Sequence, residues 1–210
     1  RRMLLSFARL KDPRLAEWIE TNVAFPNCMV DRITPATTDA HRVLARAMLG
    51  GVEDAWPVTA ESFRQWVVED NFCNGRPALE AVGVQMTDDV EPYELMKIRL
   101  LNAGHQALCH FALLLGYSTA DEAMADPQLH ALCERYMNTV RPLIPEPPGV
   151  DLRDYQRTLL SRYANPTVKD QLARIAFDAS SRIPKFVLPS AREQLQRGAP
   201  VEIFALVVAG

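Results

Sequence analysis

The pattern of the chain changes at about residue 90, and this change limits the folds that the chain can adopt. Before residue 90, short extended runs such as residues 23–35 and 82–87 alternate with helical spacing. After it, helical spacing repeats and no convincing strand follows. The sequence is therefore mixed α/β before about residue 90 and helical after it.

In the first part, turn and cap residues give the element boundaries. Asp12-Pro13 breaks a helix over 4–22, and Gly50-Gly51 ends a helix over 36–48 that begins in the 37–39 capping cluster. The other elements expected here are an extended run over 23–35, strands over 55–60 and 82–87, a strand or a helix over 63–69, and a turn over 72–77.

In the second part, helices are separated by prolines and glycines. The expected helices cover 94–116, 121–125, 127–139, 151–161, 169–180, 189–197 and the residues after 200. The proline-rich segment 141–149 is expected to be a stiff loop, and 181–186 an extended run.

The helix expected over 94–108 has an unusual arrangement of polar residues. At about 100° per residue, Glu94, Lys97, Asn102 and His105 share an arc of roughly 140°, with Lys97 and Asn102 at its two ends. Apolar residues point in many directions, including into this arc, which is typical of a buried helix. The pattern therefore predicts four functional groups in surroundings of low dielectric.

Two interpretations of this arc remain open on spacing alone. Burial lowers the pKa of a lysine, so Lys97 could act as a general base on an alcohol, while Asn102 donates to a developing oxyanion. His105 could bind a substrate hydroxyl or orient the lysine. Alternatively, the helix is amphipathic, its lysine extends to water, and its other polar residues are satisfied in the core.

Composition and motifs exclude several functional classes. A net charge of −3 with scattered basic residues gives no electrostatic case for binding nucleic acid. Cys28, Cys73, Cys109 and Cys133 are far apart, so we expect buried thiols in a reducing compartment and no metal site. We find no signal peptide, no apolar run long enough to span a membrane and no glycine-rich nucleotide fingerprint, and expect a cytoplasmic protein. Both chain ends fall inside helical patterns, which suggests part of a longer protein.

Several blocks, in the same order, resemble the long-chain mannitol dehydrogenase family. Residues 25–35 are similar to its FPN-x-MVDRITP motif, and residues 92–105 to its PYE-x-MK-x-x-LLN-x-x-H helix. Further similar blocks are 54–57, 66–70, 74–77, 149–155 and 162–166. The resemblance covers nearly the whole chain and favours the catalytic interpretation of the polar arc.

The resemblance implies an α+β chain with two parts. Residues 1–88 would be the strand-containing tail of a Rossmann-type NAD domain, whose glycine fingerprint lies upstream. Residues 89–210 would form a mostly helical catalytic domain that continues beyond residue 210. We expect the 210 residues alone to be inactive.

The resemblance also implies roles for individual residues in a metal-independent transfer of hydride. Lys97 would be the base, Asn102 would stabilise the oxyanion, His105 would bind a neighbouring hydroxyl, and Glu94 would relay the proton. The other residues implied are Val30 and Asp31 for the cofactor, and Asp31, Arg174 and Arg182 for the substrate. The two arginines could instead lie on a solvated helix face and in a salt bridge of a loop.

The expected reaction is the NAD-dependent interconversion of mannitol and fructose, by a monomer that binds neither nucleic acid nor a membrane. NADP is not excluded, because the residues that contact the ribose lie outside the chain. Arabinitol dehydrogenases and fructuronate or tagaturonate reductases of the same family remain alternatives. From another functional class, a non-catalytic helical binding module is also possible.

Overall fold

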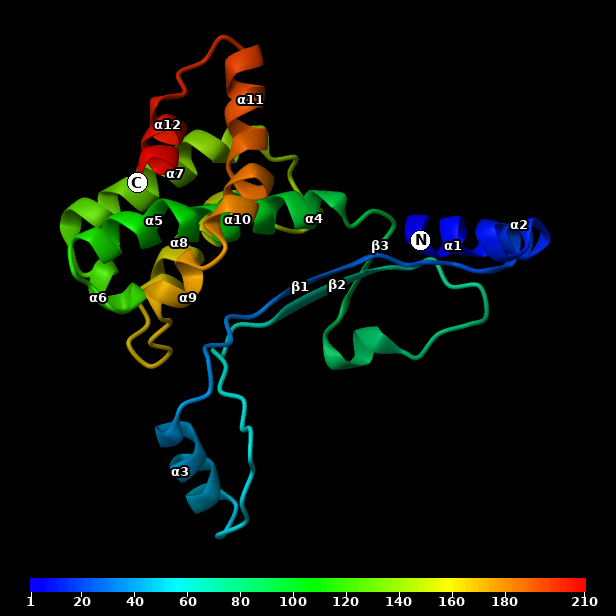
Figure 1. The fold of residues 1–210 in the computed structure, drawn as a ribbon, viewed down its shortest axis with the longest axis horizontal. Coiled ribbons are helices and arrows are strands. Elements are labelled where there is room, and N and C mark those ends of the chain that lie inside the picture. Colours follow the sequence, from blue (N-terminus) through cyan, green and yellow to red (C-terminus); the bar gives the residue numbers. More distant parts are fainter. The chain divides into compact units, whose positions relative to one another are not determined.

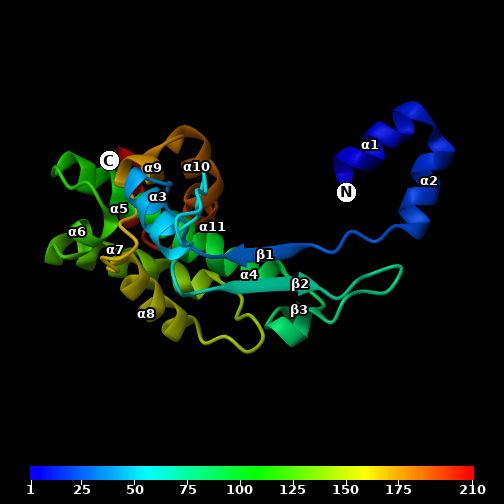
Figure 2. The ribbon, with the colours of Figure 1, turned by 90° about the horizontal axis from the view of Figure 1, so that it is seen from below.

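The computed structural model describes residues 1–210 and divides them into two compact units. Unit 1 contains Arg1–Asp31 and Gln65–Glu91, and unit 2 contains Arg32–Arg64 and Pro92–Gly210. Figures 1 and 2 show the strands in unit 1 and the large group of helices in unit 2. The α+β class, helical in its second part, is confirmed.

Unit 1 begins with a pair of helices, α1 (Arg2–Lys11) and α2 (Pro13–Asn22). The break expected at Asp12-Pro13 is confirmed. The Asp12 side chain accepts a hydrogen bond from the Arg14 backbone N–H, and Pro13 occupies the first turn of α2, where its missing N–H does no harm. The two helices pack against each other.

A small sheet completes unit 1, in the order β1-β2-β3. Its strands are β1 (Cys28–Asp31), β2 (Gln65–Glu69) and β3 (Gln85–Thr87). β2 pairs antiparallel with β1 and parallel with β3, so the segment 63–69, expected as strand or helix, contains a strand over its last five residues. Met29 and Val67 are register partners, and both are buried. The strand expected over 82–87 is shorter, because the 3₁₀ turn η1 (Leu79–Val82) precedes it.

Residues 32–64 belong to unit 2 and carry the helix α3 (Asp39–Met48), which is capped by Thr38 as expected. The strand expected over 55–60 is wrong, because no strand forms there. Two of its backbone carbonyl groups accept hydrogen bonds from side chains instead of from a neighbouring strand. Arg42 donates to the carbonyl of Ala55, and Thr37 donates to the carbonyl of Pro57. Pro57 also has no N–H to give to a neighbouring strand.

The rest of unit 2 is helical, as expected. Its elements are α4 (Glu91–Met96), the π-helical segment η2 (Lys97–Asn102), α5 (Ala103–Leu114), α6 (Ala120–Met124), α7 (Pro127–Val140), the 3₁₀ turn η3 (Arg141–Leu143), α8 (Leu152–Tyr163), α9 (Leu172–Ala176), α10 (Ala179–Phe186), α11 (Leu188–Gln196) and α12 (Glu202–Ala209). Helix α5 contacts α6, α7, α9 and α10 (Figure 1). It is therefore the central helix of the unit.

Two helical boundaries differ from those expected. The helix over 169–180 is interrupted after α9 at Phe177 and Asp178, where Asp178 has a left-handed backbone with a φ of 61°. The extended run over 181–186 is wrong, because these residues belong to α10 with Pro184 inside the helix. Packing overrides the proline here: α10 contacts α5, and Arg182 donates to the carbonyl of Ile175.

Candidate active site

The polar helix is not a uniform α-helix, because its middle turn is π-helical. The Ala103 N–H bonds to the carbonyl of Ile98, five residues earlier. In an α-helix, residues four apart share a face because the hydrogen bonds span four residues. By the same reasoning, residues five apart share a face in a π-helical turn, so Asn102 lies one turn above Lys97. The separation of roughly 140° expected for an α-helix is therefore wrong.

The α-helical turns on each side extend this face. Glu94 lies three residues before Lys97, and His105 lies three residues after Asn102, and both spacings join neighbours on one helix face. We call Glu94, Lys97, Asn102 and His105 the polar stripe. The structure thus brings the four predicted residues of this helix together along a single line.

Burial along the polar stripe is uneven. His105 is 8% exposed, whereas Glu94, Lys97 and Asn102 are partly exposed. The expectation that the helix buries all four groups is wrong for three of them. Met96 and Leu100 are fully buried on another side of the helix, so only the part of the stripe with Glu94, Lys97 and Asn102 is open to ligands or solvent, and His105 lies at its buried end.

The side chain of Asn102 is not used to cap the helix that follows it. The side chain of Lys97 makes no hydrogen bond or ion pair within the chain. An amide and an amine on one face, one helical turn apart, are therefore available to the same small ligand.

His105 is held from one side by an aromatic ring. Its imidazole stacks on Tyr163, with ring centroids 4.3 Å apart and an angle of 21° between the planes. Its Nε2 atom is buried and has no hydrogen-bond partner within the chain. Burial lowers the pKa of His105 to about 3, and the positive charges of Arg174, Arg162 and Arg182 add to this effect. His105 is thus neutral near pH 7, and Nε2 is free to bond a ligand.

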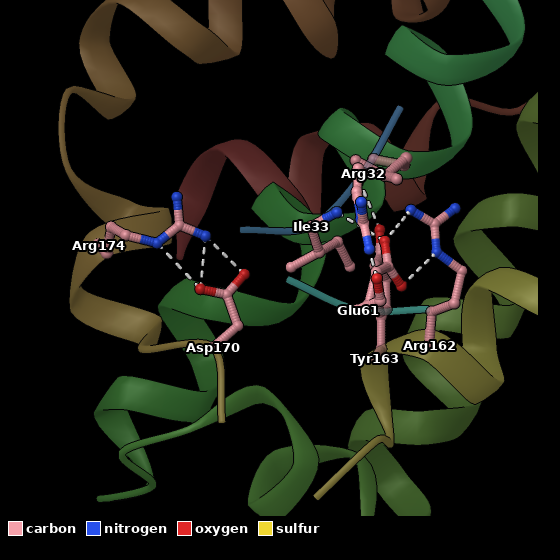
Figure 3. A network of polar contacts seen from close by, with 8 residues as sticks. Arg32, Ile33, Glu61, Arg162, Tyr163, Asp170 and Arg174 are labelled. Carbon is pink, nitrogen blue, oxygen red and sulfur yellow. Dashed lines mark hydrogen bonds and ion pairs between the residues drawn. The ribbon is translucent and has the colours of Figure 1, made fainter. Parts of the chain in front are cut away.

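The two predicted substrate-side cations lie near His105, but their partners differ. Arg174 pairs with Asp170, with Nε 2.9 Å from Oδ1 and Nη2 2.6 Å from Oδ2 (Figure 3). Asp170 is 4% exposed, so much of the Arg174 charge is compensated by a buried carboxylate. Arg182 donates only to the Ile175 carbonyl and keeps its full charge.

A buried ion pair lies beside this region. Arg162 donates from Nε and Nη2 to the two carboxylate oxygens of Glu61, at 2.9 and 2.7 Å (Figure 3). The Glu61 carboxylate also accepts from the Ile33 backbone N–H at 2.6 Å, and the guanidinium of Arg162 lies 3.9 Å from the ring centroid of Phe63. The ion pair therefore connects residues 32–64 to the end of α8.

The predicted cofactor residues lie at the end of β1, in unit 1. Val30 is 53% exposed and Asp31 is 1% exposed. They alternate as neighbours in a strand do, with one side chain on each face of the sheet. They belong to the other unit, so the structure alone does not unite them with the polar stripe.

Three residues near the site were not singled out from the sequence: Tyr163, Glu61 and Asp170. Tyr163 and Glu61 are far along the chain from their partners His105 and Arg162, so spacing gave no indication of them. Asp170 is four residues before Arg174, a helical spacing that could have indicated this pair. Gly104 could have indicated that another part of the chain approaches this helix closely, as Tyr163 does. A glycine inside a helix destabilises it by roughly 0.5–1 kcal/mol relative to alanine, and so often marks a close approach.

The structure contains no cluster of three or more His, Cys, Asp or Glu residues able to hold a metal ion. No helix in it has the length and apolar character needed to span a membrane.

Comparison with known proteins identifies the family. The model of the mannitol dehydrogenase C-terminal domain matches residues 89–210, and that of the mannitol dehydrogenase Rossmann domain matches residues 1–81. The chain belongs to the mannitol dehydrogenase family. The resemblance noted from the sequence motifs is thereby confirmed.

Individual relatives agree with this assignment. The mannitol 2-dehydrogenase of Phaeosphaeria nodorum is 48% identical over 214 residues, which cover 100% of this chain and 37% of the relative. That of Aspergillus fumigatus is 46% identical over 213 residues, covering 100% of this chain and 42% of the relative. The chain thus spans about two fifths of the length of these members of the mannitol dehydrogenase family.

Solved structures of mannitol dehydrogenase relatives share the fold. Pseudomonas fluorescens mannitol 2-dehydrogenase, in a ternary complex with NAD and D-mannitol, superimposes with a TM-score of 0.90 at 50% identity. A substrate-free D-sorbitol dehydrogenase gives a TM-score of 0.87 at 41% identity. Each comparison covers 98% of this chain and 42% of the other.

Proposed function

We propose that the chain provides the substrate side of an NAD-dependent polyol dehydrogenase, which oxidises a secondary alcohol of a sugar alcohol to a ketone. The observation that carries this proposal is the polar stripe, where an amine, an amide and a neutral imidazole share one face. Residues 1–88 would complete the Rossmann-type domain and residues 89–210 would form most of the catalytic domain, in keeping with the family matches.

In the proposed mechanism, Lys97 is the general base. As a neutral amine it accepts the hydroxyl proton, while the C–H electron pair of the same carbon leaves as hydride and the C=O bond forms. In the reverse reaction, the protonated lysine returns the proton to the ketone oxygen. Glu94, three residues earlier on the stripe, would pass the proton from Lys97 toward solvent. No step requires a metal ion.

Asn102 and His105 would orient the substrate and stabilise the charge that develops. The Asn102 amide, one turn from Lys97, donates to the oxygen that loses its proton. The buried Nε2 of His105 bonds a neighbouring hydroxyl. Because the imidazole is neutral, it can donate or accept as the hydroxyl requires.

The residues present also fit a nicotinamide cofactor. When bound, NAD supplies the hydride acceptor. Val30 offers an exposed apolar side chain at the carboxyl end of β1, and Asp31 next to it offers a buried carboxylate. In α/β sheets, ligands bind beyond the carboxyl ends of the strands. Val30 and Asp31 would therefore contact the cofactor, with Asp31 on the substrate side as well.

We propose mannitol and fructose as the substrate pair, in line with the names of the relatives. The ion pair of Arg174 with Asp170 favours a neutral polyol over a uronate, because it leaves less positive charge for a substrate carboxylate. Arg182 would line the substrate side as the remaining cation.

A substrate panel on the complete gene product tests this proposal. With NAD, we expect the highest kcat/KM for mannitol, ahead of sorbitol and arabinitol, and the same measurements with NADP determine the cofactor preference. With NADH, fructose should be reduced much faster than fructuronate or tagaturonate. Faster reduction of a uronate would contradict the substrate assignment, and binding of polyol without turnover would favour a non-catalytic binding module.

A further inference from the structure

Tyr163 joins the end of α8 to the helix that carries the polar stripe. Its ring stacks on the imidazole of His105, and its phenol donates a hydrogen bond to the backbone carbonyl of Leu101, in the π-helical segment. In a regular α-helix, that carbonyl would accept from the N–H of His105. One side chain thus contacts both the imidazole and the helical turn from which the imidazole projects.

The close approach of Tyr163 depends on Gly104. A Cβ atom at position 104 would lie 3.0 Å from the Tyr163 Oη and 3.0 Å from the Met137 side chain. A larger residue at position 104 would press on the phenol and the Met137 side chain, so glycine leaves the room that Tyr163 needs beside this helix.

The residue before Tyr163 holds the backbone of Tyr163 in place. Arg162 is held by the buried carboxylate of Glu61 in a two-bond ion pair, and both side chains are at most 5% exposed. This anchors the last turn of α8. Tyr163 is thus supported from its own backbone as well as from Gly104.

The stack also restricts the orientation of the imidazole plane. With one face of the ring covered by Tyr163, His105 cannot tilt out of this plane without losing the contact. In this plane, Nε2 is buried and has no hydrogen-bond partner within the chain.

We propose that Tyr163 is a positioning residue that holds the His105 imidazole and the turn over 101–105 in the geometry that binds the substrate hydroxyl. This inference rests on the proposed polyol dehydrogenase function. In this role Tyr163 acts through its neighbours in the chain. Its ring acts through the stack, and its phenol acts through the Leu101 carbonyl.

The first test is steady-state kinetics of the complete protein with Tyr163→Leu and Tyr163→Phe. For Tyr163→Leu we expect kcat/KM for mannitol to fall by at least about tenfold, since misplacing a group by about 1 Å can cost on the order of 10²-fold. The dissociation constant of NAD should change less than twofold. Tyr163→Phe keeps the ring and should recover most of the loss.

Tyr136→Leu is the matched control. Tyr136 is also a buried tyrosine of unit 2, but its ring packs edge-on against Phe204. Its substitution should lower stability while leaving kcat/KM per folded molecule within about twofold. An equal loss of kcat/KM in Tyr136→Leu and Tyr163→Leu would overturn the positioning role.

A double-mutant cycle identifies the partner of Tyr163. If Tyr163 acts through His105, then Tyr163→Leu with His105→Ala should be no slower than His105→Ala alone. Losses that multiply would show that Tyr163 acts elsewhere and would contradict the inference.

A second readout does not depend on turnover. A ring stacked at 4.3 Å shifts the carbon-bound imidazole protons of His105 upfield, and NMR resonances lost in His105→Ala identify them. This shift should disappear in Tyr163→Leu and persist in Tyr163→Phe, and its persistence in Tyr163→Leu would overturn the inference. If the wild-type protein turned over no polyol, the proposed function would fail, while this readout would still decide whether Tyr163 holds His105.

Discussion

Lys97 and Asn102 are five residues apart in a helical segment whose backbone hydrogen bonds also span five residues. This match places the amine of one and the amide of the other on one face, a single turn apart. A regular α-helix with the same sequence would separate them by roughly 140°, so the π-helical turn brings the two groups closer to a common substrate oxygen.

Asn102→Ala tests the oxyanion role of the amide. Removing one such donor typically costs about 2.7–4 kcal/mol of transition-state stabilisation, so kcat for mannitol should fall on the order of 10²–10³-fold. The measurement is steady-state kinetics of the complete protein with saturating NAD. Gln128→Ala, which removes an exposed amide from α7, is the matched control and should leave kcat unchanged. A kcat of Asn102→Ala close to that of wild type would remove Asn102 from the mechanism.

Arg182→Ala tests the remaining substrate-side cation. Because Arg182 has no compensating carboxylate, its loss should raise KM for mannitol by about tenfold, the effect of roughly 1.4 kcal/mol of binding energy. NAD affinity should not change, and Arg135→Ala on the exposed side of α7 provides a control. An unaltered KM would mean that Arg182 lies outside the substrate site.

The Glu61–Arg162 pair is expected to matter for stability. Glu61→Ala leaves the guanidinium of Arg162 buried without its carboxylate, and breaking a buried pair in this way typically destabilises by about 3–5 kcal/mol. Thermal unfolding of the complete protein should show a large drop in Tm. Glu134→Ala, an exposed carboxylate of α7, should leave Tm nearly unchanged, and a similarly small effect of Glu61→Ala would contradict the prediction.

His105 should make stability depend on pH. Its pKa is lowered from 6.5 to about 3 in the folded state, so between these values the unfolded chain binds more protons than the folded one. The contribution of His105 is therefore fully present above pH 6.5 and is lost as the pH falls toward 3. Comparing Tm against pH for wild type and His105→Asn checks this, and parallel curves below pH 6.5 would contradict it.

The sequence located the polar stripe but not its geometry. Glu94, Lys97, Asn102 and His105 were found from residue types and family motifs, and the structure joins them on one helix. The π-helical turn was not predictable, because one extra residue per turn leaves no compositional mark. The same applies to Tyr163, whose contact with His105 spans 58 positions of the chain and depends on tertiary packing.

The sequence predicted correctly those helix boundaries that depend only on neighbouring residues. The break at Asp12-Pro13 and the cap in the 37–39 cluster form as expected, because a side-chain oxygen next to free N–H groups needs no distant partner. Residues 55–60 and 181–186 were misassigned because side chains from elsewhere decide their conformation. Arg42 and Thr37 occupy the carbonyl groups of the first segment, and packing against α5 keeps the second helical despite Pro184.

The most direct test of the account is the turnover of mannitol by Lys97→Ala in the complete protein, measured together with NAD affinity. Loss of a general base should lower kcat by about 10²–10⁴-fold, while the dissociation constant of NAD stays within twofold of wild type. A small primary amine added to the variant should restore part of the rate, because it supplies the missing proton acceptor. Lys11→Ala, on the exposed side of α1, should behave as wild type. If Lys97→Ala kept its turnover, or lost it together with NAD binding, Lys97 would not be the base.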